Sequence, residues 1–554
     1  MSMQNYIRVS AQMIHRQSQS SADIVIVGNG IAGLTAAIEA RRFAPDLRIA
    51  IITEQSNPTI NTPALKQFAM GKLERQQLLA YPVGTERAQG IQMLQARVVE
   101  IDAHDKFVRL ANESAIGYGS LLLATGSAAV GLPTDLPGRD FYGVMTLHQL
   151  HDYMNLRRRL YEVEDVVVIG GGAHAIETVT SLLYLGIRTH WLIRGKTCLS
   201  RILDQRSSEL VMRHIQQAGA RIYTETEIVG IAGNTGAVAG VVTNHQQMLP
   251  CQLVLACTGM KPVTTLAEHC TMPIMFERDQ GIFVNNQLRT NVPDIYAAGD
   301  VAALHNPQTG NHEIRAQWYS AVVQGCTAAA AMTGQLEIHH GNATPLSWSA
   351  SSFAQQRCKE VPTTAQQPFG VHWHATRLGA LSLLTVGSPL ARTTGSVTLT
   401  DSYKRMYRRL SIFDDRLIGY LSLGQAGQAQ ADGLAIKRLI DEGHSIAPLK
   451  DALLNGTFDP RTYFSQRHSV AVLDMAISGK KPVVRTTQRA LPPVRSTLLE
   501  RVSLSSLEKE RAQADRPLSI VGFIASVASV PITPLPRPSA GVQFRVIHSP
   551  TERR

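Results

Sequence analysis

The sequence predicts an α/β fold built around two βαβ units. Two glycine-rich turns indicate this, and each follows a short run of valine and isoleucine that is typical of a buried parallel strand. A helix-forming segment and a second apolar strand then follow each turn, which is the order of a βαβ unit. The chain has 554 residues, of which 44% are hydrophobic, so its length suggests roughly three to four domains.

The first unit carries glycines at the spacing G-x-G-x-x-G, at Gly28, Gly30 and Gly33. The first glycine permits a tight turn, the second lets the backbone approach a pyrophosphate, and the third lets the helix pack close to its strand. The helix is expected over 34–43 and the second strand over 48–53. That strand ends at Glu54, whose carboxylate can accept hydrogen bonds from the ribose of an adenine nucleotide.

The second unit has the related spacing G-x-G-x-x-A, at Gly170, Gly172 and Ala175. Its helix is expected over 178–185, and its second strand, 188–193, ends at Arg194. A carboxylate at this position favours the free ribose hydroxyl of NAD, whereas an arginine can pair with the 2′-phosphate of NADP. Arg201 can add a second positive charge. The second site is therefore predicted to prefer NADPH, with NADH as the alternative.

Two dinucleotide sites on one chain indicate two cofactors that exchange a hydride, as a nicotinamide and a flavin do. Four further segments lie at 121–127, 253–262, 290–302 and 315–325. Together with the two turns, they resemble in residue type and order the FAD/NAD(P)H oxidoreductases of the pyridine nucleotide-disulfide oxidoreductase superfamily, which share the fold of glutathione reductase. The resemblance covers about residues 22–335.

The resemblance implies two Rossmann-like domains, with an FAD domain split by an inserted NAD(P) domain. The expected divisions are a flexible leader (1–21), the first part of the FAD-binding domain (22–145), the NAD(P)-binding domain (146–259), the second part of the FAD-binding domain (260–335), an α+β C-terminal domain (345–464) and a Pro- and Ser-rich basic tail (465–554).

The resemblance also assigns cofactor-binding roles to Thr125, Gly126, Gly259, Gly299, Asp300, Gln317 and Trp318. Of these, Asp300 would accept hydrogen bonds from the ribityl chain of FAD. Gln317 and Trp318 belong to the segment 315–325, which resembles the helix whose start lies beside the pyrimidine end of the flavin. Glu177 would lie at the contact between flavin and nicotinamide and orient the nicotinamide, so it is the predicted catalytic residue. The alternative for Glu177 is an exposed position on a helix face.

The cysteine positions argue against several branches of this superfamily. Members that reduce disulfides, peroxides or oxygen carry a redox cysteine near the first helix after Glu54, because a thiolate is the nucleophile in those reactions. The corresponding stretch, 57–66, has no cysteine, and the first of the six cysteines in the chain is Cys198. The Pro63-x-Leu65 spacing instead resembles the branch that reduces rubredoxin-type and iron–sulfur carriers, and the flavin half of nitrite reductases. Lys66 is displaced from the basic position of that branch and is expected to be solvated.

The segment after residue 345 predicts two strands, 403–413 and 417–423, joined by a hairpin and followed by a helix over 429–442. This order resembles the C-terminal domain of rubredoxin and nitrite reductase flavoproteins, which packs near the flavin and often forms a dimer contact. A basic stretch lies in the first strand, at Lys404, Arg405, Arg408 and Arg409. It is either a dock for an acidic electron carrier or the charged outer face of a strand.

The net charge of +11 is concentrated in the last part of the chain, since residues 461–554 contain 15 basic and 6 acidic residues. The remainder is near neutral, which argues against nucleic acid as a partner. No stretch reaches about 18 apolar residues, and residues 1–21 lack an apolar run, so neither a membrane span nor a secretory signal is expected. The cysteine usage, with no Cys-x-x-Cys pair, predicts no metal site and a cytoplasmic location.

These features together predict an FAD-dependent enzyme that takes hydride from NAD(P)H and passes electrons to a rubredoxin- or ferredoxin-like carrier, as a homodimer. Three alternatives remain open. The first is an NAD(P)H oxidase or quinone reductase with a small-molecule acceptor, and the second is the flavoprotein subunit of a nitrite reductase. The third is a redox-sensing protein that binds nucleic acid through the basic tail.

Overall fold

The computed structural model describes residues 20–306, 309–335, 369–391, 397–401, 406–425 and 433–465. The predicted tail lies outside these ranges from residue 466 onward, as do residues 1–19 of the predicted leader. Lys404 and Arg405 of the basic stretch also lie outside them. The leader prediction extends slightly too far, because Ser20 and Ser21 pair with β6 in the first strand of the protein.

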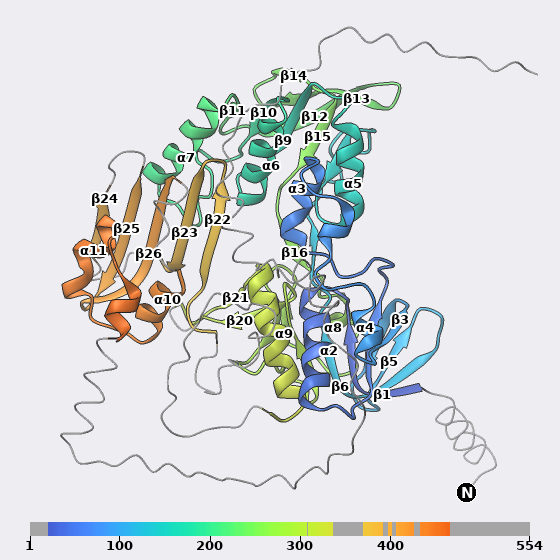
Figure 1. Cartoon of the computed structure of the whole chain (residues 1–554). Helices are drawn as coiled ribbons and strands as arrows, with labels where there is room; N and C mark the ends of the chain where they lie inside the picture. The colour runs from blue at the N-terminus through green and yellow to red at the C-terminus, as the bar shows by residue number, and fades with distance from the viewer. Residues whose placement is uncertain are drawn as a thin grey trace, which may run out of the picture.

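The first sheet has a parallel centre and is built from segments that are far apart in the chain (Figure 1). Its strand order is β3-β2-β1-β6-β5-β4, and β19 pairs in parallel with β6. The strands are β1 (Ser20–Val27), β2 (Ile49–Thr53), β3 (Gln92–Gln95), β4 (Val98–Asp102), β5 (Phe107–Leu110), β6 (Ala115–Leu123) and β19 (Ile295–Ala297). Because β19 returns to this sheet after a second sheet has been completed, the first sheet is discontinuous in sequence.

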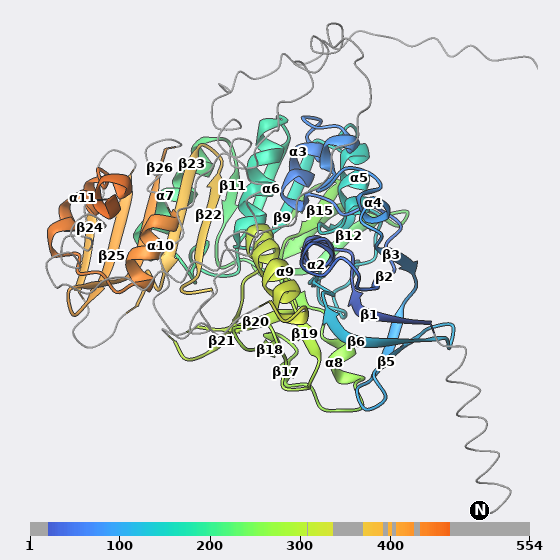
Figure 2. The ribbon, with the colours of Figure 1, turned by 60° about the horizontal axis from the view of Figure 1, so that its bottom comes forward.

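Helices α2 (Ile31–Phe43) and α9 (Trp318–Met332) pack against each other beside this sheet, as Figure 2 shows. Their contact is close because Gly325 of α9 lies against the backbone of α2, where a Cβ atom would come 2.5 Å from the carbonyl oxygen of Ala32. Helix α2 begins at the end of β1 and α9 comes from the returning segment. The pairing therefore fixes the two parts of this layer to each other.

The second sheet is entirely parallel, with the order β11-β10-β9-β15-β8. Its strands are β8 (Val144–Thr146), β9 (Asp165–Ile169), β10 (Arg188–Leu192), β11 (Arg221–Tyr223) and β15 (Leu253–Ala256), and its helices are α5 (Leu150–Arg159), α6 (Ala173–Tyr184) and α7 (Gln205–Gln217). An antiparallel sheet of β12 (Ile228–Asn234), β13 (Ala237–Thr243) and β14 (Met248–Pro250) is attached to it. Strands β7 (Ser127–Ala129) and β16 (Met260–Pro262) pair where the chain enters and leaves this layer.

Short elements complete these two layers. After β2 come η1 (Thr62–Ala64), α3 (Leu65–Ala69), η2 (Arg75–Leu78) and α4 (Thr85–Ala88). After β16 come α8 (Thr265–Glu268), β17 (Phe276–Glu277), β18 (Gly281–Val284), β20 (Ala302–His305) and β21 (His312–Ile314). The last four strands form one small sheet, in the order β17-β18-β20-β21.

The C-terminal unit is an antiparallel sheet with helices on one side. Its strands are β22 (Trp373–Leu378), β23 (Leu381–Gly387), β24 (Val397–Asp401), β25 (Tyr407–Phe413) and β26 (Arg416–Gln425), in the order β22-β23-β26-β25-β24, and its helices are α10 (Gly433–Asp441), η3 (Ala447–Leu449) and α11 (Lys450–Asn455). The predicted hairpin is present. Asp414 and Asp415 form its two-residue turn with φ of 48° and 56°, values typical of a type I′ turn.

This unit packs against the second sheet rather than standing apart (Figure 1). Leu381 and Leu421 share one buried hydrophobic cluster with Val211 and Ile215 of α7. Arg409 is buried and forms an ion pair with Asp204, the N-cap of α7, at 2.9 Å, and Arg408 is buried and donates to the carbonyl of Leu454. Both interpretations of the basic stretch are therefore wrong for these two arginines, because their charges hold the fold together.

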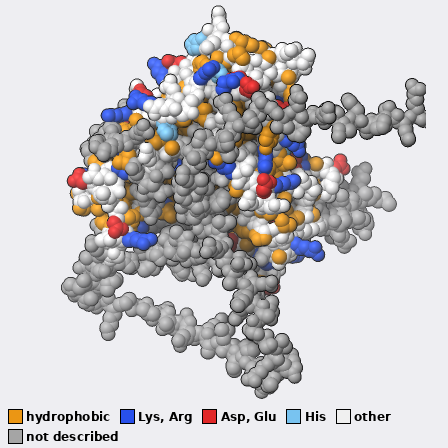
Figure 3. All heavy atoms as spheres, turned by 45° about the horizontal axis from the view of Figure 1, so that its top comes forward, with side chains coloured by type: hydrophobic (Ala, Val, Ile, Leu, Met, Phe, Trp, Pro, Cys, Tyr) orange, Lys and Arg blue, Asp and Glu red, His pale blue; other side chains and the backbone are white. Residues whose placement is uncertain are grey.

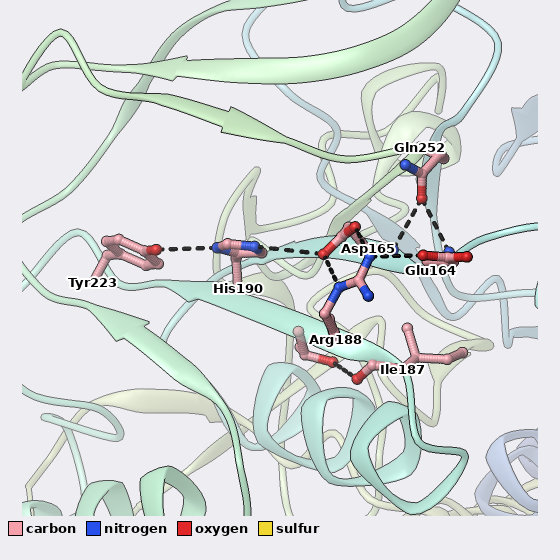
Figure 4. A network of polar contacts seen from close by, with 8 residues as sticks. Glu164, Asp165, Ile187, Arg188, His190, Tyr223 and Gln252 are labelled. Atoms are coloured by element: carbon pink, nitrogen blue, oxygen red, sulfur yellow. Dashed lines mark hydrogen bonds and ion pairs between the residues drawn. The ribbon is translucent and has the colours of Figure 1, made fainter.

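The predicted fold class is confirmed. Both helices that follow the glycine-rich turns begin earlier than expected. Helix α2 begins at Ile31, three residues before the expected start, and α6 begins at Ala173, with Gly172 as its N-cap, five residues before the expected start. A polar network lies at the end of the second sheet that is opposite its glycine-rich turn (Figure 4). In it, Arg188 donates hydrogen bonds to Asp165 and Glu164, and the His190 ring forms a hydrogen bond with the Tyr223 hydroxyl. That network joins the amino ends of β9 and β10, so it stabilises the sheet at the edge away from the glycine turn.

Candidate functional site

The two glycine-rich turns have the same backbone conformation at their first glycine. Gly28 has a φ of +112°, and a Cβ there would lie 2.3 Å from the carbonyl oxygen of Ala124. Gly170 has a φ of +134°, and a Cβ there would lie 2.2 Å from the carbonyl oxygen of Cys257. Neither position can accept a side chain, because the backbone at the end of the neighbouring parallel strand lies immediately beside each turn.

The second glycine of each turn, in contrast, faces open space. A Cβ at Gly30 or Gly172 would meet no atom within 4 Å, and each residue is the N-cap of the following helix without a side-chain cap. The free N–H groups of those first turns are thus directed at an open volume that suits a pyrophosphate. Gly33 and Ala175 serve the packing role, since a Cβ at Gly33 would lie 2.1 Å from the carbonyl oxygen of Gly28 and Ala175 is fully buried.

A cavity of about 2830 Å³ connects the first turn with residues of all three layers. The predicted site residues that line it are Gly28, Gly30, Glu54, Thr125, Gly126, Glu177, Gly299, Asp300, Gln317 and Trp318. Outside its lining are Gly33, Gly170, Gly172, Ala175, Arg194, Arg201 and Gly259. The structure therefore brings most of the predicted FAD residues together and adds Glu177 to them.

Asp300 lies deep in this cavity, where the Ser127 hydroxyl donates to its carboxylate at 2.9 Å. Burial raises the pKa of Asp300 above its ordinary value, and that hydrogen bond offsets the rise only in part. Thr125 is held by the carbonyl of Val263 at 2.8 Å, and the amide of Gly299 donates to Gln324 at 2.8 Å. A carboxylate in this position is a strong acceptor for hydroxyl groups of a bound ligand.

Glu177 joins the three layers of the protein at one point. Its Oε2 forms an ion pair with Nζ of Lys66, and its Oε1 accepts a hydrogen bond from Thr376 of β22 at 2.6 Å. The Lys66 side chain is only 19% exposed, so the expectation that it is solvated is wrong. Burial lowers the pKa of Lys66 to about 8. The exposed-surface alternative for Glu177 is also wrong, because it lines the cavity with a side chain that is 29% exposed.

Sequence reasoning missed three histidines of the site. His148 donates to the carbonyl of Ser127 at 2.7 Å, and Nδ1 of His374 accepts from the Gln317 amide. His174 lines the cavity with a buried Nε2 that has no hydrogen-bond partner among the described residues, and burial lowers its pKa to about 3. One sequence feature could have pointed to His174, namely its position inside the second glycine-rich motif, between Gly172 and Ala175. His374 had no such feature, because only the packing of β22 brings it to α9.

The predicted phosphate-binding arginines lie apart from the cavity, on the surface beyond β10. Arg194 and Arg201 are exposed, and so is Lys196 between them. None of the three forms an ion pair with another residue in the part of the chain that the structure describes. On the face shown in Figure 3, positive and negative side chains are interspersed.

None of the described cysteines lines the cavity. Cys198, Cys251, Cys257 and Cys326 are buried. Burial raises the pKa of Cys198 and of Cys257 to about 11, so both remain protonated thiols at neutral pH. The arrangement therefore offers no thiolate nucleophile for disulfide exchange within the described residues. No helix in those ranges is long and apolar enough to cross a membrane.

Known proteins are similar to this chain in sequence and in fold. A probable ferredoxin reductase of Castellaniella defragrans is 29% identical over 316 residues, which are 56% of this chain and 76% of the relative. A rubredoxin-NAD(+) reductase of Pseudomonas putida is 27% identical over 313 residues, 56% of this chain and 80% of the relative. The crystal structure of a ferredoxin reductase from Rhodopseudomonas palustris aligns with a TM-score of 0.66 and 24% identity, covering 80% of this chain and 99% of that one.

The family model described as pyridine nucleotide-disulphide oxidoreductase matches residues 22–325, more than half of the chain. The match spans both glycine turns, the connecting strands and the start of α9. The protein belongs to the pyridine nucleotide-disulphide oxidoreductase family and is an FAD-dependent oxidoreductase of NAD(P)H.

Proposed function

We propose that this enzyme transfers hydride from a reduced nicotinamide nucleotide to FAD and passes the electrons one at a time to a small rubredoxin- or ferredoxin-like protein. The observation that carries the proposal is the cavity at which three layers meet around Glu177 without any cysteine in its lining. A flavin site without a thiol suits a one-electron acceptor outside the protein better than a disulfide substrate. The relatives named ferredoxin reductase and rubredoxin-NAD(+) reductase support the same acceptor class.

The first turn and the cavity fit FAD. The open volume at Gly30 would receive the pyrophosphate, Glu54 at the end of β2 is exposed and can accept from the ribose, and Asp300 can accept from the ribityl hydroxyls. The helix that begins at Trp318, with Gln317 as its N-cap, would lie beside the pyrimidine end. When bound, FAD supplies the hydride acceptor and the one-electron donor of the reaction.

The chain's own residues position the nicotinamide. Glu177 lies four residues inside α6, and the turn before that helix would bind the pyrophosphate of the nucleotide. The carboxylate is fixed from two sides, by Lys66 and by Thr376, so it can hold the nicotinamide amide in one orientation. His174, with its unpartnered Nε2, stands in the first turn of the same helix and supports a polar ligand group at this place. Positioning supplies the rate, since a hydride step needs no acid or base.

We propose NADPH as the preferred nucleotide. Arg194, Lys196 and Arg201 give the end of β10 three exposed positive charges where an NAD-specific site would carry a carboxylate. The 2′-phosphate of NADPH would pair with Arg194. The relatives include a rubredoxin-NAD(+) reductase, so NADH is the competing assignment.

The test is an anaerobic titration of the purified flavoprotein with NADPH and NADH, followed at the flavin absorbance near 450 nm. We expect rapid bleaching, and on adding oxidised ferredoxin or rubredoxin we expect recovery of the absorbance with two carriers reduced per nucleotide. Binding without bleaching would remove the reductase assignment. Bleaching that only oxygen or a quinone reverses would favour the oxidase or quinone reductase alternative.

A second measurement tests the nucleotide. In Arg194→Glu, the change removes a phosphate partner and adds repulsion, so we expect KM for NADPH to rise by at least tenfold more than KM for NADH. Arg221→Glu is a suitable control, because Arg221 is exposed at the amino end of β11, whereas Arg194 follows the carboxyl end of the neighbouring β10. Equal changes for both nucleotides would contradict the preference.

A further inference from the structure

The cavity extends along α6, from Glu177 to Tyr184 and away from both glycine-rich turns, and this extension is called the arm. It runs along α6, whose lining residues Glu177, Thr180, Ser181 and Tyr184 are three or four positions apart and therefore share one face of the helix. From Glu177 to Tyr184 the helix advances seven residues, or about 10 Å at 1.5 Å per residue. The arm thus connects the proposed nicotinamide position with the end of the helix.

The two walls of the arm come from different layers. One wall is α3 with the residues that follow it, as far as Leu73, and the other is β22 with the turn into β23. The walls meet α6 at the inner end, through the contacts of Lys66 and Thr376 with Glu177. At the outer end Nζ of Lys72 lies 3.6 Å from the centroid of the Tyr184 ring. Arg377, the next residue of β22, also lines the cavity.

The outer end of the arm carries positive charge at the protein surface. Lys72 is exposed, Tyr184 is 38% exposed, and Arg377 is half-buried. Burial lowers the pKa of Lys72, and the positive charge of Arg377 lowers it further, so the two cations act on each other. The acidic residues of the cavity lining are elsewhere: Glu54 at the end of β2, Asp300 beside Ser127, and Glu177 paired with Lys66. Like charges held together at an opening attract an anionic partner.

We propose that the rim formed by Lys72, Tyr184 and Arg377 is the surface on which acidic side chains of the electron carrier dock. This inference rests on the proposed function. A protein carrier is favoured over a small anion, because the rim lies on the outside and a redox group near the carrier surface can approach the arm without entering it. Docking at Arg408 and Arg409, which was one of the two interpretations of the basic stretch, is excluded because both side chains are buried.

The number of electrons transferred determines how many carriers must bind for each nucleotide that is oxidised. One NAD(P)H delivers a hydride, that is two electrons and one proton, to FAD. Two oxidised carriers then dock in turn, and each takes one electron, which reduces one ferric iron to ferrous iron. The products are NAD(P)⁺, two reduced carriers and one proton released to water. The rim must therefore bind and release a carrier twice per nucleotide, so charge pairs that favour fast association suit it better than a tight apolar interface.

The test uses the full-length, FAD-loaded protein and the variants Lys72→Glu and Arg377→Glu. Arg206→Glu is the matched control, because Arg206 is exposed on α7, lies outside the cavity lining and gives the same change in net charge. The probes are an acidic [2Fe–2S] ferredoxin, a rubredoxin and the uncharged acceptor 1,4-benzoquinone. The measurements are kcat/KM for each acceptor over a range of ionic strength, and the rate at which NAD(P)H bleaches the flavin.

We expect Lys72→Glu and Arg377→Glu to lower kcat/KM for the acidic carriers about tenfold at low salt and to flatten its dependence on ionic strength. The loss should be confined to the acidic carriers, and Arg206→Glu should match the wild type. Rim variants that behave like the control would overturn the dock while leaving the proposed function intact. An equal loss with benzoquinone would assign the arm to a small acceptor and would also overturn it. If the wild type bleaches with NAD(P)H but reduces neither carrier, the proposed function fails, and the dock fails with it.

Discussion

Removing the carboxylate of Asp204 should detach the C-terminal unit from the rest of the protein. Asp204 is the N-cap of α7 and accepts from the amide of Ser207 at 2.9 Å. Its other oxygen accepts from Arg409 at 2.9 Å and from the Tyr407 hydroxyl, so one carboxylate connects α7 to β25. The side chains of Asp204 and Arg409 are 19% and 9% exposed. Asp204→Ala therefore leaves a buried guanidinium without its counter-charge.

The magnitude follows from two contributions. Loss of an N-cap costs about 1 kcal/mol, and loss of one partner from a buried ion pair costs about 3 to 5 kcal/mol. Arg409 retains only one strong acceptor from the described contacts, the carbonyl of Pro389 at 2.9 Å. The expected destabilisation is about 4 to 6 kcal/mol, which is comparable with the whole unfolding free energy of many domains, about 5 to 15 kcal/mol. The C-terminal unit should thus separate before the two parallel sheets unfold.

The assay is urea denaturation followed by circular dichroism, combined with timed proteolysis of the native protein. Asp204→Ala should unfold in two transitions, with the C-terminal unit unfolding at the lower urea concentration, and it should be cleaved more rapidly within 369–465. The control is Asp279→Ala, which removes an exposed ion pair with Lys261 at 2.9 Å and should cost at most about 1 kcal/mol. A single transition in Asp204→Ala, within 1 kcal/mol of the control, would refute the assignment of Asp204 as the anchor.

Three further predictions concern the same surfaces. Gly170→Ala should weaken nucleotide binding and leave FAD content unchanged, because its Cβ would collide with the carbonyl of Cys257; isothermal titration and flavin absorbance measure both, and unchanged nucleotide affinity would contradict it. Thr376→Val should raise KM for the nucleotide by about tenfold, since the charged hydrogen bond to Glu177 contributes about 1.5 to 3 kcal/mol, whereas Thr309→Val in an exposed turn should not. Burial raises the pKa of Asp204, but hydrogen bonds from Tyr407, Ser207 and Arg409 outweigh it and lower the pKa below its ordinary value of about 3.9. Its stabilisation is therefore fully present above about pH 4 and lost as the pH falls below that, so proteolysis of the C-terminal unit should accelerate there and not between pH 5 and 8.

The parts of the fold that the sequence predicted correctly are those in which the backbone itself restricts the residue. Gly28 and Gly170 adopt positive φ beside the end of a neighbouring parallel strand, so no other residue fits, and the constraint is visible in the sequence as the spacing of the glycines. Strands and helices around those turns follow the apolar pattern for the same local reason. The start of α6 was placed five residues late, because Ala-His-Ala has no distinctive periodicity and only the N-cap at Gly172 defines the boundary.

The errors concern charged and polar side chains whose partners are distant in the chain. Lys66 meets a partner 111 residues away, and Thr376 reaches Glu177 across 199 residues. A lysine or arginine surrounded by polar neighbours in sequence is usually solvated, and nothing local separates that case from a buried pair. The positions of Arg408 and Arg409 were predicted wrongly for the same reason. They are neighbours in β25, so their side chains lie on opposite faces of the sheet, and both are buried.

The convergence at Glu177 gives the C-terminal unit a function of its own. The first layer supplies Lys66, the second supplies Glu177, and β22 supplies Thr376, so the carboxylate is held from both sides only when all three parts are packed. The same strand carries His374 to Gln317 and Arg377 to the rim of the arm. Because the ion pair of Asp204 with Arg409 connects this sheet to α7, a defect there should disorder the proposed nicotinamide position and the rim together. A variant such as Asp204→Ala should therefore raise KM for the nucleotide and for the carrier in parallel, whereas Lys72→Glu should change the carrier alone.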